Sequence, residues 1–329
     1  MTDMTEVLSA VPVGSGGNRL DWAATPEPVR RSIEEHLGSR VVEARSQAGG
    51  FSPGLAAQLL LADGRRFFVK AIGTSRNPLS PDMFRREARI AAALPSEAPA
   101  PRLLWTYDDG DWVALVFADV EGRTPSEPWT RPELDRVLAA LPGLWESLTP
   151  APIQITTIAG DWAADFLEWS ALAAMPSIPA GLVAADPWAA PRLDQLAALE
   201  SAWSTAVEGT TLLHGDLRAD NILLTKDRVV FVDWPGALVG PAWADLVFLL
   251  PSVGMHGIDP EEIFTAHPVA RTADPDAVTS LLSGIAGYFI GASLQPPPPG
   301  LPRVRQFQLA QGRAALSWLR TRLAGSRSR

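Results

Sequence analysis

The chain has 329 residues, of which 47% are hydrophobic and 20% charged, and its net charge is −9. This suffices for one two-lobed domain with a real core or for two domains. The acidic balance argues against nucleic acid as a main partner, because nucleic-acid binding depends on neutralising phosphates. The chain contains no cysteine, which excludes disulfides and thiolate metal sites. At the start of the chain, Asp3 and Glu6 stand where a secretion signal would carry lysine or arginine, so we expect a cytoplasmic protein.

The first predicted strands flank a glycine-rich turn. Residues 41–47 and 55–61 have strand composition, and the turn spans 49–54. Glycine allows backbone N–H groups to approach phosphate oxygens, although this segment does not match GxGxxG and an ordinary turn is the alternative. Its position just before a strand lysine favours a phosphate-covering turn, with contacts expected from Gly50, Ser52 and Gly54.

Lysine is rare in this chain: Lys70 and Lys226 are the only two, so each is informative. Lys226 lies in a predicted turn, where a solvated loop charge is the simpler interpretation. Lys70 lies in the half-buried strand predicted over 65–72. A compact ammonium on a flexible stem suits contact with the α- and β-phosphates of a nucleotide, a role that the forked arginine side chain would not fill in the same way.

A helix is predicted to begin at Ser80 and Pro81, a pair typical of a helix N-cap and first position. It carries Glu87 among apolar residues. A strand at 112–117 follows.

Between residues 150 and 208 the chain is rich in tryptophan and predicted to be helical. Asp161, Asp165 and Glu168 have the spacing of one helix face, beside the aromatic residues Trp162, Phe166 and Trp169. Two interpretations stay open: an acidic and aromatic surface for an amine-bearing substrate, or a solvated acidic face above a packed aromatic one. A second acidic cluster, formed by Asp259, Glu261 and Glu262, has the same two interpretations.

The segment 211–233 contains the most informative pattern. A short strand precedes His214-Gly-Asp216, and a hairpin predicted over 221–233 brings Asp233 close to Asn221. Asp216 is then available as a base, while Asn221 and Asp233 supply oxygen ligands for Mg²⁺. A base beside an oxygen-lined metal site is what magnesium-dependent phosphoryl transfer requires.

The motifs HGDLRADN (214–221), VDW (232–234) and GPAWADL (240–246) resemble those of aminoglycoside phosphotransferases and choline kinase-like enzymes, which share the protein-kinase fold. The resemblance implies that Asp216 is the catalytic base, that Asn221 and Asp233 hold magnesium, and that Asp245 braces the catalytic loop. We expect His214 to fix the turn through backbone hydrogen bonds. Arg218 is expected to stabilise charge on the transferred phosphoryl group.

The resemblance also suggests how the nucleotide is held. It implies an ion pair between Lys70 and Glu87, for which a solvated helix glutamate is the alternative. It places the adenine-reading edge at residues 116–120, which include Phe117 and Asp119. It further places the acceptor site within residues 150–208.

Two helices are predicted near the C-terminus. The uncharged stretch 277–295 is long enough to require a comparison with a membrane span, but its glycines and serines and the prolines that follow favour a buried helix. Residues 301–323 have the pattern of an amphipathic helix with arginines on one side.

The sequence as a whole predicts an α+β, two-lobed protein-kinase-like fold. Residues 1–117, which include an N-terminal helical extension, would form a β-rich nucleotide-binding lobe, and residues 118–329 a mainly helical catalytic and substrate-binding lobe.

The expected activity is ATP- and Mg-dependent phosphorylation of a small-molecule hydroxyl, with GTP as an alternative donor. An antibiotic such as an aminoglycoside or nucleoside is the favoured acceptor; choline, homoserine or a sugar derivative is the alternative. A silent nucleotide-binding protein is a third reading. We expect no nucleic-acid or membrane partner, and a monomer or homodimer.

Overall fold

A computed structural model describes residues 19–47, 53–77, 80–298 and 301–326. They fall into two compact units. The sheet unit consists of the described residues up to Pro125 together with Asp220–Gly236, and the helical unit consists of Ser126–Ala219 and the described residues from Ala237 onward. The sequence-based division after residue 117 stays a prediction.

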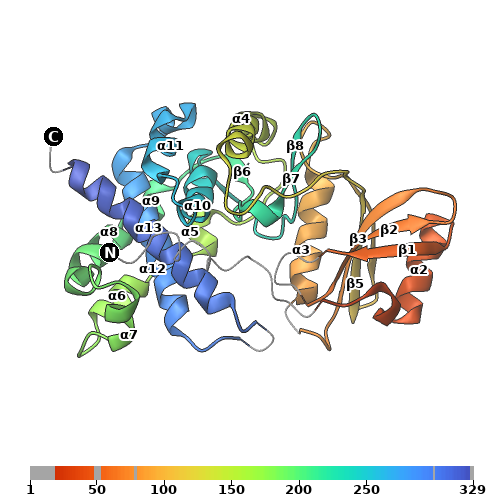
Figure 1. Ribbon diagram of the computed structural model, residues 1–329, viewed down its shortest axis with the longest axis horizontal. Coiled ribbons are helices and arrows are strands. Elements are labelled where there is room, and N and C mark those ends of the chain that lie inside the picture. The colour runs from red at the N-terminus through yellow and green to blue at the C-terminus, as the bar shows by residue number, and fades with distance from the viewer. Residues whose placement is uncertain (1–18, 48–52, 78–79, 299–300, 327–329) are drawn as a thin grey trace. The chain divides into compact units, whose positions relative to one another are not determined.

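The sheet unit is built on an antiparallel sheet of five strands in the order β1-β2-β3-β5-β4 (Figure 1). Four of these strands follow the predicted ranges, and the fifth, β4, was not predicted. Its side chains are mostly half-buried or exposed, so it lacks a continuous apolar pattern. The strands are β1 (Val41–Ser46), β2 (Leu55–Leu61), β3 (Arg66–Gly73), β4 (Leu103–Asp108) and β5 (Trp112–Ala118).

Each face of this sheet packs against a helix, and Figure 1 shows the two helices on opposite sides of the strands. Helix α2 (Glu27–Leu37) contributes Val29, Ile33 and Leu37 to one core, and helix α3 (Ser80–Ala93) contributes Phe84 and Ala91 to the other. Successive strand side chains point to opposite faces. Lys70 therefore shares the α3 face of the sheet with Ile72.

The predicted hairpin is present as β7 (Ile222–Leu224) and β8 (Val229–Phe231), which pair from Ile222 with Phe231 to Leu224 with Val229. Backbone hydrogen bonds join it to the rest of the sheet unit. The Phe231 N–H donates to the Pro99 carbonyl at 2.7 Å, and the Leu224 N–H donates to the Arg123 carbonyl at 2.7 Å. The hairpin is thus held at both ends.

The helical unit holds most of the helices and one short strand pair, β6 (Thr211–Leu213) with β9 (Leu238–Gly240). The long helices are α4 (Arg131–Ser147), α10 (Trp243–Gly254), α12 (Pro275–Leu294) and α13 (Val304–Ser326). The shorter ones are α5 (Ile158–Asp161), α6 (Glu168–Ala173), α7 (Ala180–Ala185), α8 (Leu193–Ser201), α9 (Trp203–Ala206) and α11 (Pro260–Ala266). Short 3₁₀ turns are η2 (Ala190–Arg192) and η4 (Pro268–Thr272) in the helical unit, η1 (Trp22–Ala24) in the sheet unit, and η3 (Ala219–Asn221), where the chain passes from the helical unit to the sheet unit.

Helix α12 corresponds to the stretch predicted as a buried helix. By length and composition it is the one helix among the described residues that could cross a membrane, and 67% of that apolar window is buried inside the fold. Its buried positions run almost without interruption from Ala277 to Gly287. Such burial is typical of a core helix, and α13 runs alongside it (Figure 1).

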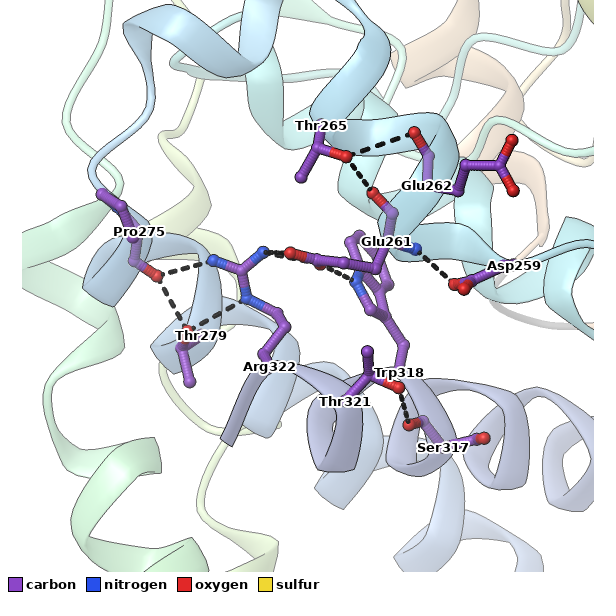
Figure 2. Close-up of polar contacts among 10 residues, drawn as sticks. All are labelled: Asp259, Glu261, Glu262, Thr265, Pro275, Thr279, Ser317, Trp318, Thr321 and Arg322. Atoms are coloured by element: carbon purple, nitrogen blue, oxygen red, sulfur yellow. Dashed lines mark hydrogen bonds and ion pairs between the residues drawn. The ribbon is translucent and has the colours of Figure 1, made fainter. Parts of the chain in front are cut away.

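The acidic cluster at the start of α11 is part of the packing of the helical unit (Figure 2). Asp259 caps the helix by accepting the Glu261 N–H at 2.9 Å. Glu261 accepts two hydrogen bonds from Arg322 Nη1, at 3.0 and 2.8 Å, and one from Trp318 Nε1 at 2.5 Å. Arg322 also donates to Thr279 and to the Pro275 carbonyl. One carboxylate thus ties α11 to α13, and Arg322 extends the tie to α12.

Candidate active site

Lys70 is the centre of a buried ion-pair cluster in the sheet unit. Its Nζ lies 2.5 Å from Glu87 Oε2 and 2.6 Å from Asp233 Oδ1, and 5.1 Å from the centre of the Phe84 ring. Glu87 is 2% exposed because its position on α3 lies between the inward-facing Phe84 and Ala91. The expected Lys70–Glu87 ion pair is therefore present, and its role in nucleotide binding stays a prediction.

The electrostatics of this cluster keep Lys70 positively charged. Burial lowers the pKa of Lys70, but the charges and hydrogen bonds of Asp233 and Glu87 outweigh burial and raise it overall. Burial raises the pKa of Glu87 to about 7, against the opposing effects of the Lys70 charge and a hydrogen bond from the Trp234 N–H. The two carboxyl groups therefore orient the Lys70 ammonium, and Lys70 stays protonated.

Asn221 and Asp233 flank the open end of the β7–β8 hairpin. The Val232 N–H donates to the Asn221 carbonyl at 2.9 Å, and Asp233 follows directly with φ of 69°. This left-handed conformation is unusual for a residue other than glycine and is often found at functional positions. An amide and a carboxylate are hard oxygen donors that fit Mg²⁺, which keeps several waters and phosphate oxygens as its other ligands.

The residues predicted around the nucleotide base and phosphates are only partly described. Gly50 and Ser52 lie outside the described residues. At Gly54 a side chain would collide with the Ala71 carbonyl, since a Cβ atom there would lie 2.5 Å from its oxygen. Phe117 is buried in the core on the α3 face, and Asp119 accepts a hydrogen bond from Gln58 at 3.0 Å. Their contacts with adenine stay predictions.

The loop that carries Asp216 belongs to the helical unit, and Asp245 holds it through backbone hydrogen bonds. The carboxylate of Asp245, on the first turn of α10, is fully buried and accepts the N–H groups of His214 and Gly215 at 3.0 Å each. His214 is also fully buried, and its Nδ1 accepts the Asp216 N–H at 3.4 Å. Gly215 has φ of 76°, which glycine adopts without strain.

Asp216 itself is half-exposed and lies beside Arg218, whose Nε is 3.4 Å from Asp216 Oδ1. The guanidinium carbon of Arg218 lies 5.6 Å from the centre of the Phe307 ring on α13. Burial raises the pKa of the nearby Glu127, which the charge of Arg218 partly offsets. Arg218 therefore sits next to the carboxylate expected to act as base, between aromatic and acidic neighbours.

The helix expected to align three carboxylates does not form. Helix α5 ends at Asp161, turns follow, and α6 begins at Glu168, so Asp161, Asp165 and Glu168 do not share one helix face. Tertiary packing overrides the local pattern here, because the Trp162 ring packs edge to face against Phe166 and at a tilt against Phe248 of α10.

For Trp169 the sequence left open an acceptor surface or a packed aromatic face, and the structure agrees with the packed face. Its side chain is fully buried, and Nε1 donates to the Ser283 carbonyl at 2.8 Å. Glu168 packs against Gly291, and burial followed by the charge of Glu200 raises its pKa. Asp165 is exposed and Trp162 partly exposed, and their contact with a substrate stays a prediction.

A family model described as "Phosphotransferase enzyme family" (APH) matches residues 50–274. This range contains Lys70, Glu87, the catalytic loop and Asp245. The chain belongs to this family. As a family member it is a small-molecule phosphotransferase, a kinase whose acceptor is a hydroxyl group, as the sequence motifs predicted. A search of curated proteins finds no match.

Solved structures of other phosphotransferases share the protein-kinase-like fold. A thermostable mutant of aminoglycoside phosphotransferase APH(4)-Ia, in complex with ADP and hygromycin B, has a TM-score of 0.59 at 14% identity, covering 89% of this chain and 98% of that one. A choline/ethanolamine kinase family protein from Mesorhizobium loti has a TM-score of 0.59 at 16% identity, covering 91% and 98%. The amicoumacin kinase hAmiN has a TM-score of 0.50 at 12% identity, covering 85% and 92%.

Several residues around these phosphotransferase motifs were missed by the sequence analysis. Trp145 donates to Asp245, and Phe307 lies against Arg218. Burial, followed by the charges of Asp165 and Asp216, raises the pKa of Tyr288. Trp145, Tyr288 and Phe307 each lie 70 or more residues from Asp216 in the chain, and no local sequence pattern marks them. Only the folded structure brings them to the catalytic loop.

Proposed function

We propose that this phosphotransferase transfers the γ-phosphoryl group of ATP, with Mg²⁺, to a hydroxyl group of a small molecule. The observation that carries the proposal is the buried Lys70 cation, held 2.5 Å from Glu87 and 2.6 Å from the predicted metal ligand Asp233. An ammonium held in this way suits the α- and β-phosphates of a nucleotide. GTP is the alternative donor.

Each residue has a distinct proposed task. Asn221 and Asp233 would hold magnesium, which when bound neutralises charge on the phosphates. Asp216 accepts the proton of the acceptor hydroxyl as the new oxygen–phosphorus bond forms, and the bond from the γ-phosphorus to ADP breaks, so that ADP leaves. Arg218 stabilises negative charge on the transferred group from beside Asp216.

An antibiotic is the proposed acceptor. Two structures of similar fold support it, since one is a complex of APH(4)-Ia with hygromycin B and the other an amicoumacin kinase. The net charge of −9 permits a cationic acceptor such as an aminoglycoside. The second candidate is a metabolic kinase of choline, homoserine or a sugar derivative, which the choline/ethanolamine kinase family protein supports. The joint presence of Lys70, Asp216, Asn221 and Asp233 argues against a silent nucleotide-binding protein.

The test is a mass-spectrometric screen for acceptors that gain one phosphoryl group from ATP in the presence of Mg²⁺. We expect Asp216→Ala to abolish the transfer while leaving the thermal unfolding temperature close to that of the parent protein, because Asp216 is half-exposed. Transfer that persists in Asp216→Ala would contradict the assigned base.

A growth assay separates the two acceptor classes. Expression in a sensitive host is expected to raise its tolerance of an aminoglycoside such as hygromycin B, and the Asp216→Ala variant to lose this effect. Phosphorylation of choline or homoserine without any gain in tolerance would favour the metabolic role.

We further propose a cytoplasmic monomer or homodimer without nucleic-acid or membrane partners.

A further inference from the structure

Trp145 connects helix α4 to the loop that carries Asp216. Its indole is 5% exposed, and Nε1 donates to Asp245 Oδ2 at 3.2 Å. The same carboxylate accepts the backbone N–H groups of His214 and Gly215. One buried carboxylate thus receives three donors, two of them from the catalytic loop itself.

The end of α4 is tied to the strand that leads into this loop. The Thr149 hydroxyl lies 2.8 Å from that of Thr211 and donates to the Trp145 carbonyl at 2.7 Å. The Leu212 N–H donates to the Leu148 carbonyl at 3.0 Å. The Trp145 indole therefore starts from a backbone that is already aligned with β6.

His267 supports the other side of the indole. The two rings meet edge to face, with centres 5.7 Å apart and planes at 80°. His267 Nδ1 accepts the Val269 N–H at 3.2 Å, so its proton is on Nε2, which donates to the Leu138 carbonyl at 3.2 Å. With its ring packed on one side and its N–H bonded on the other, the indole has little freedom to turn.

We propose that Trp145 is a positioning residue, which aligns the Asp216 loop through the Asp245 carboxylate. Removing one of three donors leaves the buried carboxylate less well satisfied and less fixed in position, so the two loop N–H groups that it accepts are less firmly placed. Phenylalanine at this position fills most of the same volume but donates no hydrogen bond. The catalytic part of this inference rests on the proposed function, and the structural part does not.

Hydrogen exchange tests the structural part without any substrate. In Trp145→Phe we expect the backbone amides of residues 211–218 to exchange about tenfold faster, as the loss of one hydrogen bond to a charged group implies. The matched control is Trp318→Phe, which also removes a buried indole donor to a carboxylate in the helical unit, at Glu261 (Figure 2). Equal exchange of residues 211–218 in the two variants would overturn the proposal.

Kinetics test the catalytic part, with ATP and water as the acceptor so that no substrate needs to be known. Trp145→Phe is expected to lower kcat about tenfold with KM for ATP unchanged, and Trp318→Phe to change neither. In an Asp245→Asn background the effect of Trp145→Phe should shrink, because both residues act on the same loop. Additive effects would overturn the route through Asp245. Altered exchange in a protein that hydrolyses no ATP would support Trp145 as a loop support and count against the proposed function.

Discussion

At the scale of single residues, Lys70, one of two lysines in the chain, is held by two carboxylates. The Lys70 side chain is 11% exposed, and its ammonium is shared by the buried Glu87 on α3 and the more exposed Asp233 that follows β8. The side chain of Asp233 is 42% exposed, whereas that of Glu87 is 2% exposed. The proposed magnesium ligand Asp233 thus shares the Lys70 ammonium with the buried Glu87.

Replacing Lys70 with methionine leaves Glu87 buried without its ammonium. We expect the free energy of unfolding to fall by about 3–5 kcal/mol, as when one partner of a buried pair is removed. Chemical denaturation measures this change. The double variant Lys70→Met with Glu87→Met should recover most of the stability, because no unpaired charge then stays buried. It should not recover nucleotide binding, because the ammonium is absent. A single variant as stable as the parent would show that the pair is solvated.

At the scale of elements, helices far apart in the chain are joined by a few charged side chains. The side chains of Glu261 on α11 and Arg322 on α13 are 25% and 8% exposed, and Figure 2 shows their hydrogen bonds beside Trp318. Arg322 also lies over the ring of Phe264, which packs against Trp318. Arg85 on α3 joins Asp108 on β4 in a similar way, at a more exposed position.

Glu261→Gln removes the charge that Arg322 and Trp318 share. We expect a loss of about 1–3 kcal/mol in unfolding free energy, because bonds to a charged acceptor are stronger than neutral ones. The control is Glu262→Gln. Glu262 is 71% exposed and 3.9 Å from its nearest cationic partner, so its loss should cost little. Similar losses in both variants would contradict the assigned role of Glu261.

The Arg85 guanidinium, through a side-chain hydrogen bond, holds the pKa of Asp108 at about 2, with help from the Gly110 N–H. Because the folded pKa is lowered, this carboxylate stabilises the fold above its ordinary pKa of 3.8, and the contribution is lost as the pH falls toward 2. Asp108→Asn should therefore lose stability at pH 6 but little at pH 2, as thermal unfolding at several pH values would show. An equal loss at both values would exclude this linkage.

At the scale of the whole molecule, the sheet unit is formed by two separate stretches of the chain. Residues Asp220–Gly236 lie in the sheet unit although the segments on both sides of them belong to the helical unit. The loop of Asp216 and the hairpin of Asn221 and Asp233 are consecutive in sequence, so one short stretch serves both units.

Nucleotide binding should stabilise the whole chain. At a MgATP concentration of about 100 times Kd, we expect a gain of about 2.7 kcal/mol, seen as a higher Tm. Asp233→Asn should abolish most of the gain that depends on Mg²⁺, and EDTA should do the same for the parent protein. An equal gain with and without Mg²⁺ would contradict Asp233 as a metal ligand.

Local patterns predicted most of the sheet unit and the hairpin. Strands β2, β3 and β5 and the β7–β8 hairpin follow apolar and β-branched runs, and the helix from Ser80 follows its N-terminal signals. The edge strand β4 was missed because its side chains are only partly buried. The segment from Asp161 to Glu168 was predicted as one helix, although packing of Trp162 and Phe166 breaks it into turns.

The sequence by itself determined the chemical groups and the family, since the spacing of His214, Asp216, Asn221 and Asp233 is set along the chain and survives without coordinates. Only the tertiary structure decided that Asp233 also meets Lys70, that Trp169 is buried, and that Trp145 reaches Asp245 across 100 residues. The physical reason is that burial and buried hydrogen bonds depend on contacts between distant segments, whereas a motif records only neighbours along the backbone.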